Sequence, residues 1–179
     1  VPTVFSALGT VPPTLITLLW GANDATMTGE IQHVPINEFA ENVRGIISSL
    51  RVLYPLSTSN DPLQQTHIVL ISPGPIDDTR ESKRTNENTG LYVAELEAIA
   101  SEFNMPFLNI YKLMQLETNW KSFLSDGLHL SKSGNSFLFR ELLALIDSQI
   151  SCLTEESIPH PLPHWSQVDF AHPEKSFLK

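Results

Sequence analysis

The chain has 179 residues, of which 41% are hydrophobic and 17% charged, and it carries a formal net charge of -9. This length allows one domain of ordinary size, and an acidic chain with scattered Lys and Arg argues against a nucleic-acid partner. The sequence contains no apolar run of the roughly 18 residues that a membrane-spanning helix requires. Its single cysteine, Cys152, favours a reducing compartment such as the cytoplasm.

Three short apolar segments predict the strands of a sheet. Residues 14–20 form a nearly continuous apolar, β-prone run that stops at Gly21, which is typical of a strand buried on both faces. Residues 67–71 predict a second buried strand, and residues 106–110 predict a third short one.

Three helices are predicted between and after these strands, because apolar side chains recur there every three or four residues. The patterns run over residues 35–53, 93–103 and 137–150, and the first of them starts at a proline, which suits the first helical position. The hydroxyl group of Ser131 or Ser133 can cap the last helix.

The alternation of strands and helices predicts a parallel sheet with right-handed crossovers and helices on both faces. We expect residues 1–157 to form this α/β domain, and residues 158–179, where prolines interrupt regular structure, to form a surface tail. In such sheets the site lies outside the carboxyl ends of the strands. Asn23, Ser72 and Asp126 all follow predicted strands, so one crevice can collect them.

The segment Asp126-Gly127-Leu128-His129 holds a carboxylate and an imidazole three residues apart, just before the last predicted helix. These are two of the three groups of a hydrolase triad, in which a histidine acts as general base and a buried acid holds its ring in the required tautomer. The pattern alone is weak, because Asp-Gly is common turn chemistry. Asn23 alone is weaker still, because an asparagine after a strand commonly serves the turn itself.

The two motifs in this order, about a hundred residues apart, form a specific pattern. Residues 20–25 read Trp-Gly-Ala-Asn-Asp-Ala, residues 32–35 Gln-His-Val-Pro, residues 39–42 Phe-Ala-Glu-Asn and residues 124–131 Leu-Ser-Asp-Gly-Leu-His-Leu-Ser. With these motifs the chain resembles the SGNH hydrolases, also called GDSL esterases, and within them the isoamyl acetate-hydrolysing esterases. The resemblance extends from about Leu15 to about Pro173.

The resemblance implies the fold, the activity and the roles of three residues. The fold would be a three-layer α/β/α parallel sheet of flavodoxin-like type, and the activity would be hydrolysis of short-chain acyl esters such as acetates, without a metal or organic cofactor. Asn23 matches the asparagine whose side-chain amide helps to stabilise the oxyanion. His129 matches the general base and Asp126 the acid that orients it.

Two motifs of the SGNH hydrolases have no counterpart in the sequence. The Gly-Asp-Ser segment that carries the nucleophile at the end of the first strand is missing, as is the glycine-bearing segment that supplies a backbone oxyanion donor. Ser6 is the only serine before Asn23, but it lacks the Gly-Asp context and the helices that should follow, so we predict no nucleophile in this chain. We therefore expect an N-terminally truncated hydrolase domain that lacks its first strands and leaves residues 15–20 as an apolar edge.

Two functions remain open at this point. The first is an ester hydrolase with a Ser-Asp-His triad that acts on a small-molecule ester, of which this chain is a truncated, inactive form. The alternative is a catalytically inactive SGNH-like protein that keeps the crevice and acts in binding or regulation. The oligomeric state does not follow from the sequence.

Other polar and aromatic residues have simpler interpretations. A metal site formed by the tail histidines and Asp169 is improbable, because their proline-rich spacing falls on no regular element. The polar stretch 76–89 shows no periodicity and predicts a surface loop with solvated carboxylates, part of a lid over the acyl pocket. Four phenylalanines are expected in the core. The residues concerned are His160, His164 and His172 in the tail, Asp77 and Asp78 in the loop, and Phe103, Phe107, Phe137 and Phe139 in the core.

Overall fold

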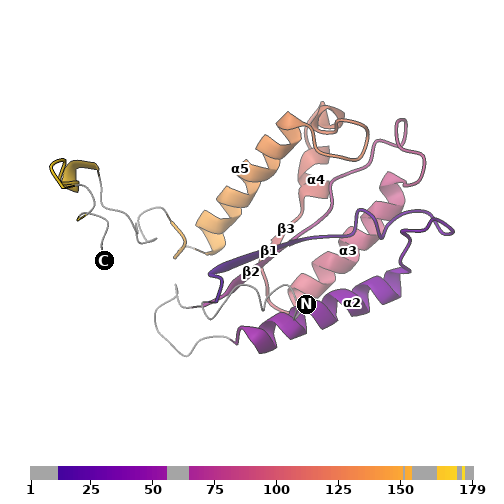
Figure 1. Cartoon of the computed structure of the whole chain (residues 1–179). Coiled ribbons are helices and arrows are strands. Elements are labelled where there is room, and N and C mark those ends of the chain that lie inside the picture. Colours follow the sequence, from indigo (N-terminus) through magenta and orange to yellow (C-terminus); the bar gives the residue numbers. More distant parts are fainter. Residues whose placement is uncertain (1–11, 56–64, 151, 155–164, 173–174, 176–179) are drawn as a thin grey trace.

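The computed structural model describes residues 12–55, 65–150, 152–154, 165–172 and 175. Short strands alternate with helices along these residues (Figure 1). The elements are β1 (Leu15–Leu19), α2 (Ile36–Leu53), β2 (His67–Ile71), α3 (Asn86–Glu102), β3 (Phe107–Leu108), α4 (Ile110–Gln115), the 3-10 helix η3 (Trp120–Phe123), α5 (Lys132–Gln149) and the 3-10 helix η4 (Trp165–Gln167).

The three strands form a parallel sheet in the order β1-β2-β3. Strand β1 pairs with β2 along its whole length, from Leu15 opposite His67 to Leu19 opposite Ile71. The short strand β3 pairs with the end of β2. The predicted parallel pairing is therefore confirmed, although the third strand is shorter than expected because Asn109 caps α4, accepting a hydrogen bond from the backbone N–H of Lys112 at 2.9 Å.

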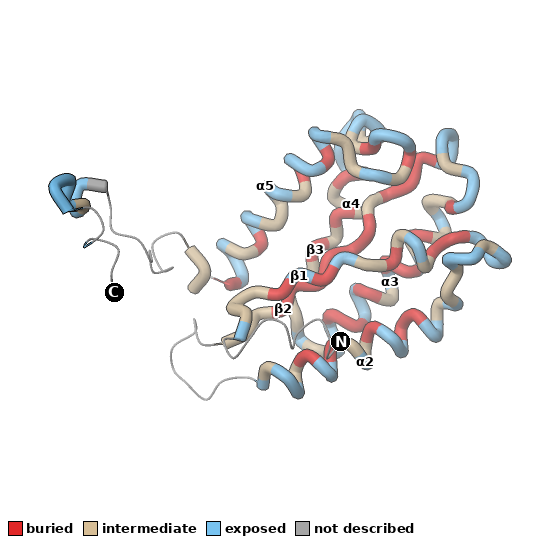
Figure 2. The backbone as a smooth tube through the Cα atoms, viewed as in Figure 1, coloured by how far each residue is buried: buried red, intermediate tan, exposed pale blue. Residues whose placement is uncertain are grey.

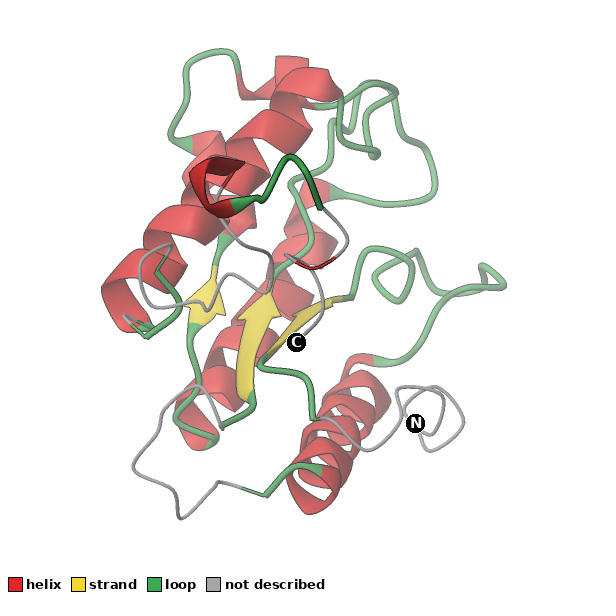
Figure 3. Ribbon diagram, turned by 60° about the vertical axis from the view of Figure 1, so that its left-hand side comes forward, coloured by secondary structure: helices red, strands yellow, loops and turns green. Residues whose placement is uncertain are grey.

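Helices cover both faces of this sheet (Figure 3). The alternating side chains of β2 explain the two layers, since Ile68 and Leu70 pack in one apolar cluster with α2 and α3. Val69 and Ile71 point to the other face, in a second cluster with α4 and α5. The three-layer α/β/α fold is thus confirmed, and Figure 2 shows the buried residues concentrated along the strands and the inner helix faces.

Strand β1 differs from its prediction, because only one of its faces is buried. Ile16 and Leu18 are buried against α2 and α3, whereas Thr17 and Leu19 on the other face are exposed, Leu19 to 41%. The second apolar cluster centres on β2 and β3, and β1 is the edge of the described sheet. An apolar edge at this strand was expected, and Leu19 forms part of it.

Some helix ends and core positions differ from their predictions. Pro35 is the N-cap of α2 and not its first residue, and the N-cap of α5 is Ser131, whose hydroxyl accepts from the backbone N–H of Gly134 at 3.2 Å. Phe137 is buried as expected, but the prediction for Phe139 is wrong, since it lies on the outer face of α5 and is 68% exposed. Phe103 and Phe107 are half-buried against the first cluster.

The predicted boundary between domain and tail falls outside the described residues, so it stays a prediction. In the described part of the tail, Asp169 and His172 are exposed. No helix among the described residues is both long and apolar enough to cross a membrane.

Candidate active site

Asp126 and His129 form a hydrogen-bonded pair in the loop before α5. The Nδ1 atom of His129 lies 2.7 Å from Oδ2 of Asp126, and Oδ1 accepts from the backbone N–H groups of Leu128 and His129 at 3.0 and 2.8 Å. The bond to the His129 ring, followed by these backbone bonds, holds the pKa of the Asp126 carboxyl well below its usual range. An ionised Asp126 accepts a hydrogen bond from Nδ1–H of His129, which leaves Nε2 as the acceptor that a general base requires.

The burial of this pair differs from the expectation of a buried acid. The side chains of His129 and Asp126 are 73% and 55% exposed. Bonds within four consecutive residues hold the pair, so its geometry does not require enclosure by other elements. An antiparallel bridge between Leu124 and Leu130 closes the loop at its base.

Asn23 lies in a tight turn directly after β1. The turn starts at Gly21, whose φ of +103° favours glycine, and the N–H of Ala25 donates to the Gly21 carbonyl at 3.0 Å. The buried Thr26 donates to the carbonyl of Asn23 from both its N–H and its hydroxyl, at 3.2 and 3.0 Å. The turn therefore fixes the backbone and leaves the side chain of Asn23 exposed.

Arg84 contacts the side chain of Asn23, a role that no sequence pattern indicates. Its Nη2 donates to Oδ1 of Asn23 and to Oε1 of Gln32, both at 3.0 Å, and its Nε donates to the carbonyl of Ala22 at 2.7 Å. The Arg84 side chain is only 5% exposed. The Oδ1 atom of Asn23 thus accepts a hydrogen bond from Arg84, and no described residue accepts one from Nδ2 of Asn23.

The segment from Ile76 to Thr85, here called the bridging loop, is exposed over most of residues 78–83, as predicted for a surface loop, but two of its charged residues, Asp77 and Arg84, are buried. Asp77 is buried and forms a 2.7 Å ion pair with Lys121. This bond, with those from Thr79, lowers the pKa of Asp77 from 3.8 to about 2. Asp78 is exposed as expected, and its carboxylate accepts from the first N–H of α3 at 2.6 Å.

The bridging loop contacts both halves of the predicted site. On one side Arg84 holds the Asn23 turn. On the other, the N–H of Asp77 donates to the carbonyl of Gly127 at 2.9 Å, and the guanidinium of Arg80 donates to the carbonyl of Ser125. The turn after β1 and the loop before α5 are therefore joined through the bridging loop, which follows the carboxyl end of β2 (Figure 1).

Two serines that follow or flank the strand ends, Ser72 and Ser125, are engaged in local bonds. Ser72 is fully buried, donating to the carbonyl of Pro73 and accepting from the N–H of Tyr111. Ser125 donates to the carbonyl of His129 at 3.0 Å. Among the described residues no serine hydroxyl bonds to the His129 ring, and Ser6 lies outside them.

A metal site finds no support in the described part of the chain. His160 and His164 lie outside it, and the carboxylate of Asp169 accepts from the backbone N–H groups of Ala171 and His172 at 2.9 and 3.3 Å. No group of three or more potential metal ligands occurs within the described residues.

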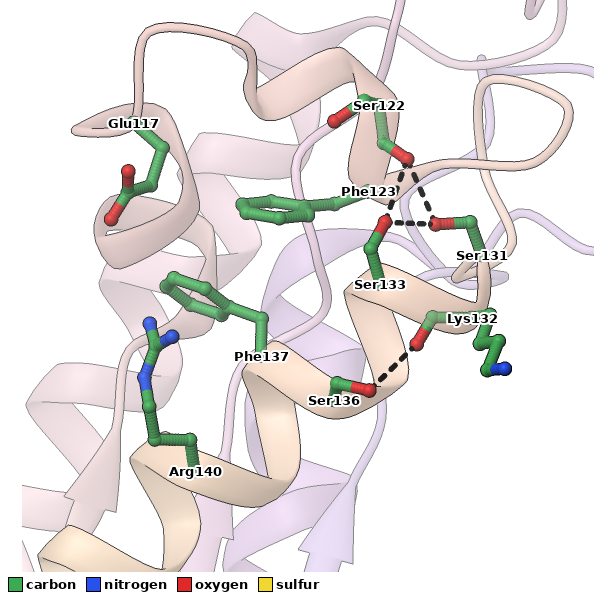
Figure 4. A pocket seen from close by; sticks show the side chains of 9 residues that line it. All are labelled: Glu117, Ser122, Phe123, Ser131, Lys132, Ser133, Ser136, Phe137 and Arg140. Carbon is green, nitrogen blue, oxygen red and sulfur yellow. Dashed lines mark hydrogen bonds between the residues drawn. The ribbon is translucent and has the colours of Figure 1, made fainter.

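A groove lined in part by Ser131, two residues after His129, has a different character. It measures about 720 Å³ and runs between η3 and the first half of α5 (Figure 4). Phe123 and Phe137 line its floor, and the hydroxyls of Ser131 and Ser133 both donate to the carbonyl of Ser122. Neither Asn23 nor His129 lines this groove, so it is not the crevice predicted from the strand ends.

Comparison with known proteins decides the family. Residues 1–137 match the GDSL-like lipase/acylhydrolase family. The chain belongs to this family. A GDSL esterase/lipase of Arabidopsis thaliana is 34% identical over 193 aligned residues, which cover 97% of this chain and 75% of that protein. A human isoamyl acetate-hydrolyzing esterase 1 homolog is 32% identical, with 93% of this chain and 66% of that protein covered.

Two solved structures of esterases or lipases share the fold. A lipase/acylhydrolase from Enterococcus faecalis superposes with a TM-score of 0.62 at 23% identity, covering 76% of this chain and 63% of its own. An acetyl xylan esterase gives a TM-score of 0.61 at 17% identity, with 81% and 72% covered. The chain therefore spans about two thirds of the length of the human relative and of the Enterococcus structure.

Proposed function

We propose that this protein is the part of a carboxylic ester hydrolase that carries the general base, its orienting acid and an oxyanion donor. The observation that carries the proposal is the 2.7 Å bond between His129 Nδ1 and Asp126 Oδ2, in a loop tied to the Asn23 turn by the bridging loop. Membership of the GDSL-like lipase/acylhydrolase family supports the same reaction class.

Each of the three residues would have one task in acyl transfer. Nε2 of His129 would take the proton of a serine hydroxyl as it attacks the ester carbonyl, and would then return that proton to the leaving alcohol. Asp126 would hold the ring and stabilise the imidazolium. The Nδ2 group of Asn23 would donate to the oxyanion, an interaction for which about 3 to 4 kcal/mol is typical.

We propose that the nucleophilic serine belongs to a segment preceding Val1, and that the 179-residue chain alone lacks it. The hydroxyls of Ser72 and Ser125 donate to backbone carbonyls, which supports this assignment. Such a segment would pack on the exposed outer face of β1, because no described residue covers Thr17 and Leu19 on that face. Below, the serine-containing form means the chain extended by that segment.

Short-chain acyl esters such as acetates are the proposed substrates. Relatives named isoamyl acetate-hydrolyzing esterase homologs suggest this class, as does a structural neighbour named acetyl-xylooligosaccharide esterase. The proposed reaction needs neither metal nor organic cofactor. With a single cysteine, the chain suits the cytoplasm, which we propose as its location.

The test compares hydrolysis of p-nitrophenyl acetate by the 179-residue chain and by the serine-containing form, each with and without His129→Ala. We expect the short chain and its variant to match the uncatalysed rate. The serine-containing form should be active and should lose at least about a thousand-fold in kcat with His129→Ala.

Two results would contradict the proposal in different ways. If the short chain is active and His129→Ala abolishes this activity, the nucleophile lies within the 179 residues and Ser6 is the first to replace. If the serine-containing form is inactive, or unaffected by His129→Ala, the ester-hydrolase assignment fails and a role in binding or regulation takes its place.

A further inference from the structure

Arg84 carries a permanent charge yet is almost fully buried beside the Asn23 turn. Its ion pair with Glu81 is long, at 3.6 Å between Nη1 and Oε1. Its shorter contacts go to neutral oxygens, those of Ala22, Asn23 and Gln32, at 2.7 to 3.0 Å. Burial of a charge is costly unless hydrogen bonds satisfy it, so these acceptors hold the guanidinium in one place.

We propose that Arg84 is a positioning residue that fixes the side-chain amide of Asn23 with Oδ1 toward the guanidinium and Nδ2 turned away from it. A guanidinium donates hydrogen bonds and cannot accept them. Rotating the Asn23 amide by 180° would set its N–H groups against Nη2 of Arg84. One N–H of Nη2 would then lose its acceptor, while the other would keep its bond to Gln32. Only the orientation with Oδ1 toward Arg84 avoids this.

The consequence for catalysis rests on the proposed function. An oxyanion is stabilised by Nδ2–H, whereas a flipped amide would face it with the lone pairs of Oδ1. The charged donor on Oδ1 also polarises the amide, which strengthens Nδ2–H as a donor. Arg84 would thus favour the transition state through Asn23 without touching the substrate.

The orientation can be tested on the 179-residue chain by NMR, without any activity. The side-chain NH₂ signals of Asn23 are assigned by their loss in Asn23→Ala, and their heteronuclear NOE is compared in Arg84→Met, Arg84→Lys and the control Arg44→Met. Arg44 pairs with Glu102 on the surface between α2 and α3. In the native chain and in the control we expect the heteronuclear NOE of a rigid Asn23 amide. In Arg84→Met we expect the chemical shifts of the Asn23 NH₂ group to change and its NOE to fall to that of the exposed Asn37.

Unchanged Asn23 signals in Arg84→Met would overturn the proposal. Should that variant fail to fold, Arg84→Lys decides, because one ammonium nitrogen cannot reproduce three bonds from two guanidinium nitrogens. A native-like amide in Arg84→Lys would then be the contradicting result.

The catalytic part is tested in the serine-containing form by a double-mutant cycle of Asn23→Ala and Arg84→Lys. If Arg84 acts through Asn23, Arg84→Lys lowers kcat by about tenfold with KM changed by less than about twofold, and has almost no effect in the Asn23→Ala background. Independent, multiplying effects would overturn the catalytic part. If Asn23→Ala itself leaves kcat unchanged, the proposed oxyanion role fails, while the NMR result still decides the orientation.

Discussion

The Asn23 turn and the Asp126–His129 pair both hold a polar group in one orientation, but they do so by different means. The pair is held by bonds that span no more than three residues. The amide of Asn23 is held by Arg84, which lies 61 residues further along the chain. The first orientation is encoded within one short motif, whereas the second depends on how a distant loop folds.

This difference gives the bridging loop two separate tasks. For Asn23 it supplies the group that sets the side-chain orientation. For the Asp126–His129 pair it leaves the internal bond alone and instead anchors the surrounding loop, through the N–H of Asp77 and the guanidinium of Arg80. Changes in the pair itself should therefore alter activity, while changes at its anchors should alter stability.

Replacement of Asp126 by Asn should have the largest effect on activity. An amide can donate to Nδ1 of His129 and so favour the tautomer that cannot serve as base, which costs about 10⁴-fold in kcat in a comparable triad. The measurement is kcat for p-nitrophenyl acetate in the serine-containing form, with Asp147→Asn on the exposed face of α5 as control. A loss of less than about tenfold would show that Asp126 does not orient the base.

Gly127→Ala should show how tightly the bridging loop holds the pair. The φ of Gly127 is +100°, and an added Cβ would lie 2.9 Å from the Cβ of Arg80. Gly29 is a matched control, because its φ is +99° and nothing lies within 4 Å of its added Cβ. Both variants carry the backbone strain, but only Gly127→Ala should lose a further 1 to 3 kcal/mol or so in unfolding free energy. Equal losses in urea titrations would contradict this anchoring.

Asp77→Asn should destabilise the protein in a pH-dependent way. The pKa of Asp77 is about 2 in the folded chain, below its ordinary 3.8, because Lys121 and Thr79 bond its charged form. The stabilisation is therefore fully present above about pH 4 and is lost as the pH falls through about 2. We expect the Tm difference between native chain and Asp77→Asn to be constant from pH 5 to 7 or so and to shrink toward pH 2 or so. A difference independent of pH would contradict the ion pair.

The smallest expected effect concerns the start of α5, directly after the pair. Ser131→Ala removes the N-cap bond to Gly134 and should cost about 1 kcal/mol in unfolding free energy. Ser133→Ala is the control, since both hydroxyls donate to the carbonyl of Ser122 but only Ser131 caps the helix. Equal effects of the two variants would show that the bond to Ser122 matters and the cap does not.

The features predicted correctly from the sequence are those encoded by neighbouring residues. The strands around 15–19 and 67–71 follow from apolar runs, and the Asp126–His129 bond follows from a spacing of three residues. The misses depend on distant contacts. Arg84 and Asp77 sit in a polar stretch without periodicity, and their partners, Asn23 and Lys121, lie more than 40 residues away, so no local pattern marks them as buried.

An apolar edge at β1 was expected, but the burial of this strand on both faces was predicted wrongly, for a related reason. The apolar composition of β1 predicts that both of its faces are buried. Sequence periodicity does not indicate which other elements cover each face, and among the described residues only one face is covered. Likewise, a triad commonly has a buried acid, but the bonds that hold Asp126 are made within its own loop and leave it half exposed. Local bonding and enclosure are therefore separate properties, of which only the first can be predicted from the motif.

The most direct test of the account is a crystal structure of the serine-containing form after reaction with diethyl p-nitrophenyl phosphate, whose adduct mimics the tetrahedral intermediate. The account predicts a phosphorylated serine with its Oγ beside Nε2 of His129, and a phosphoryl oxygen within hydrogen-bond distance of Nδ2 of Asn23. An adduct whose phosphoryl oxygen points away from Asn23, or a serine remote from His129, would contradict the assignment of these residues to one site.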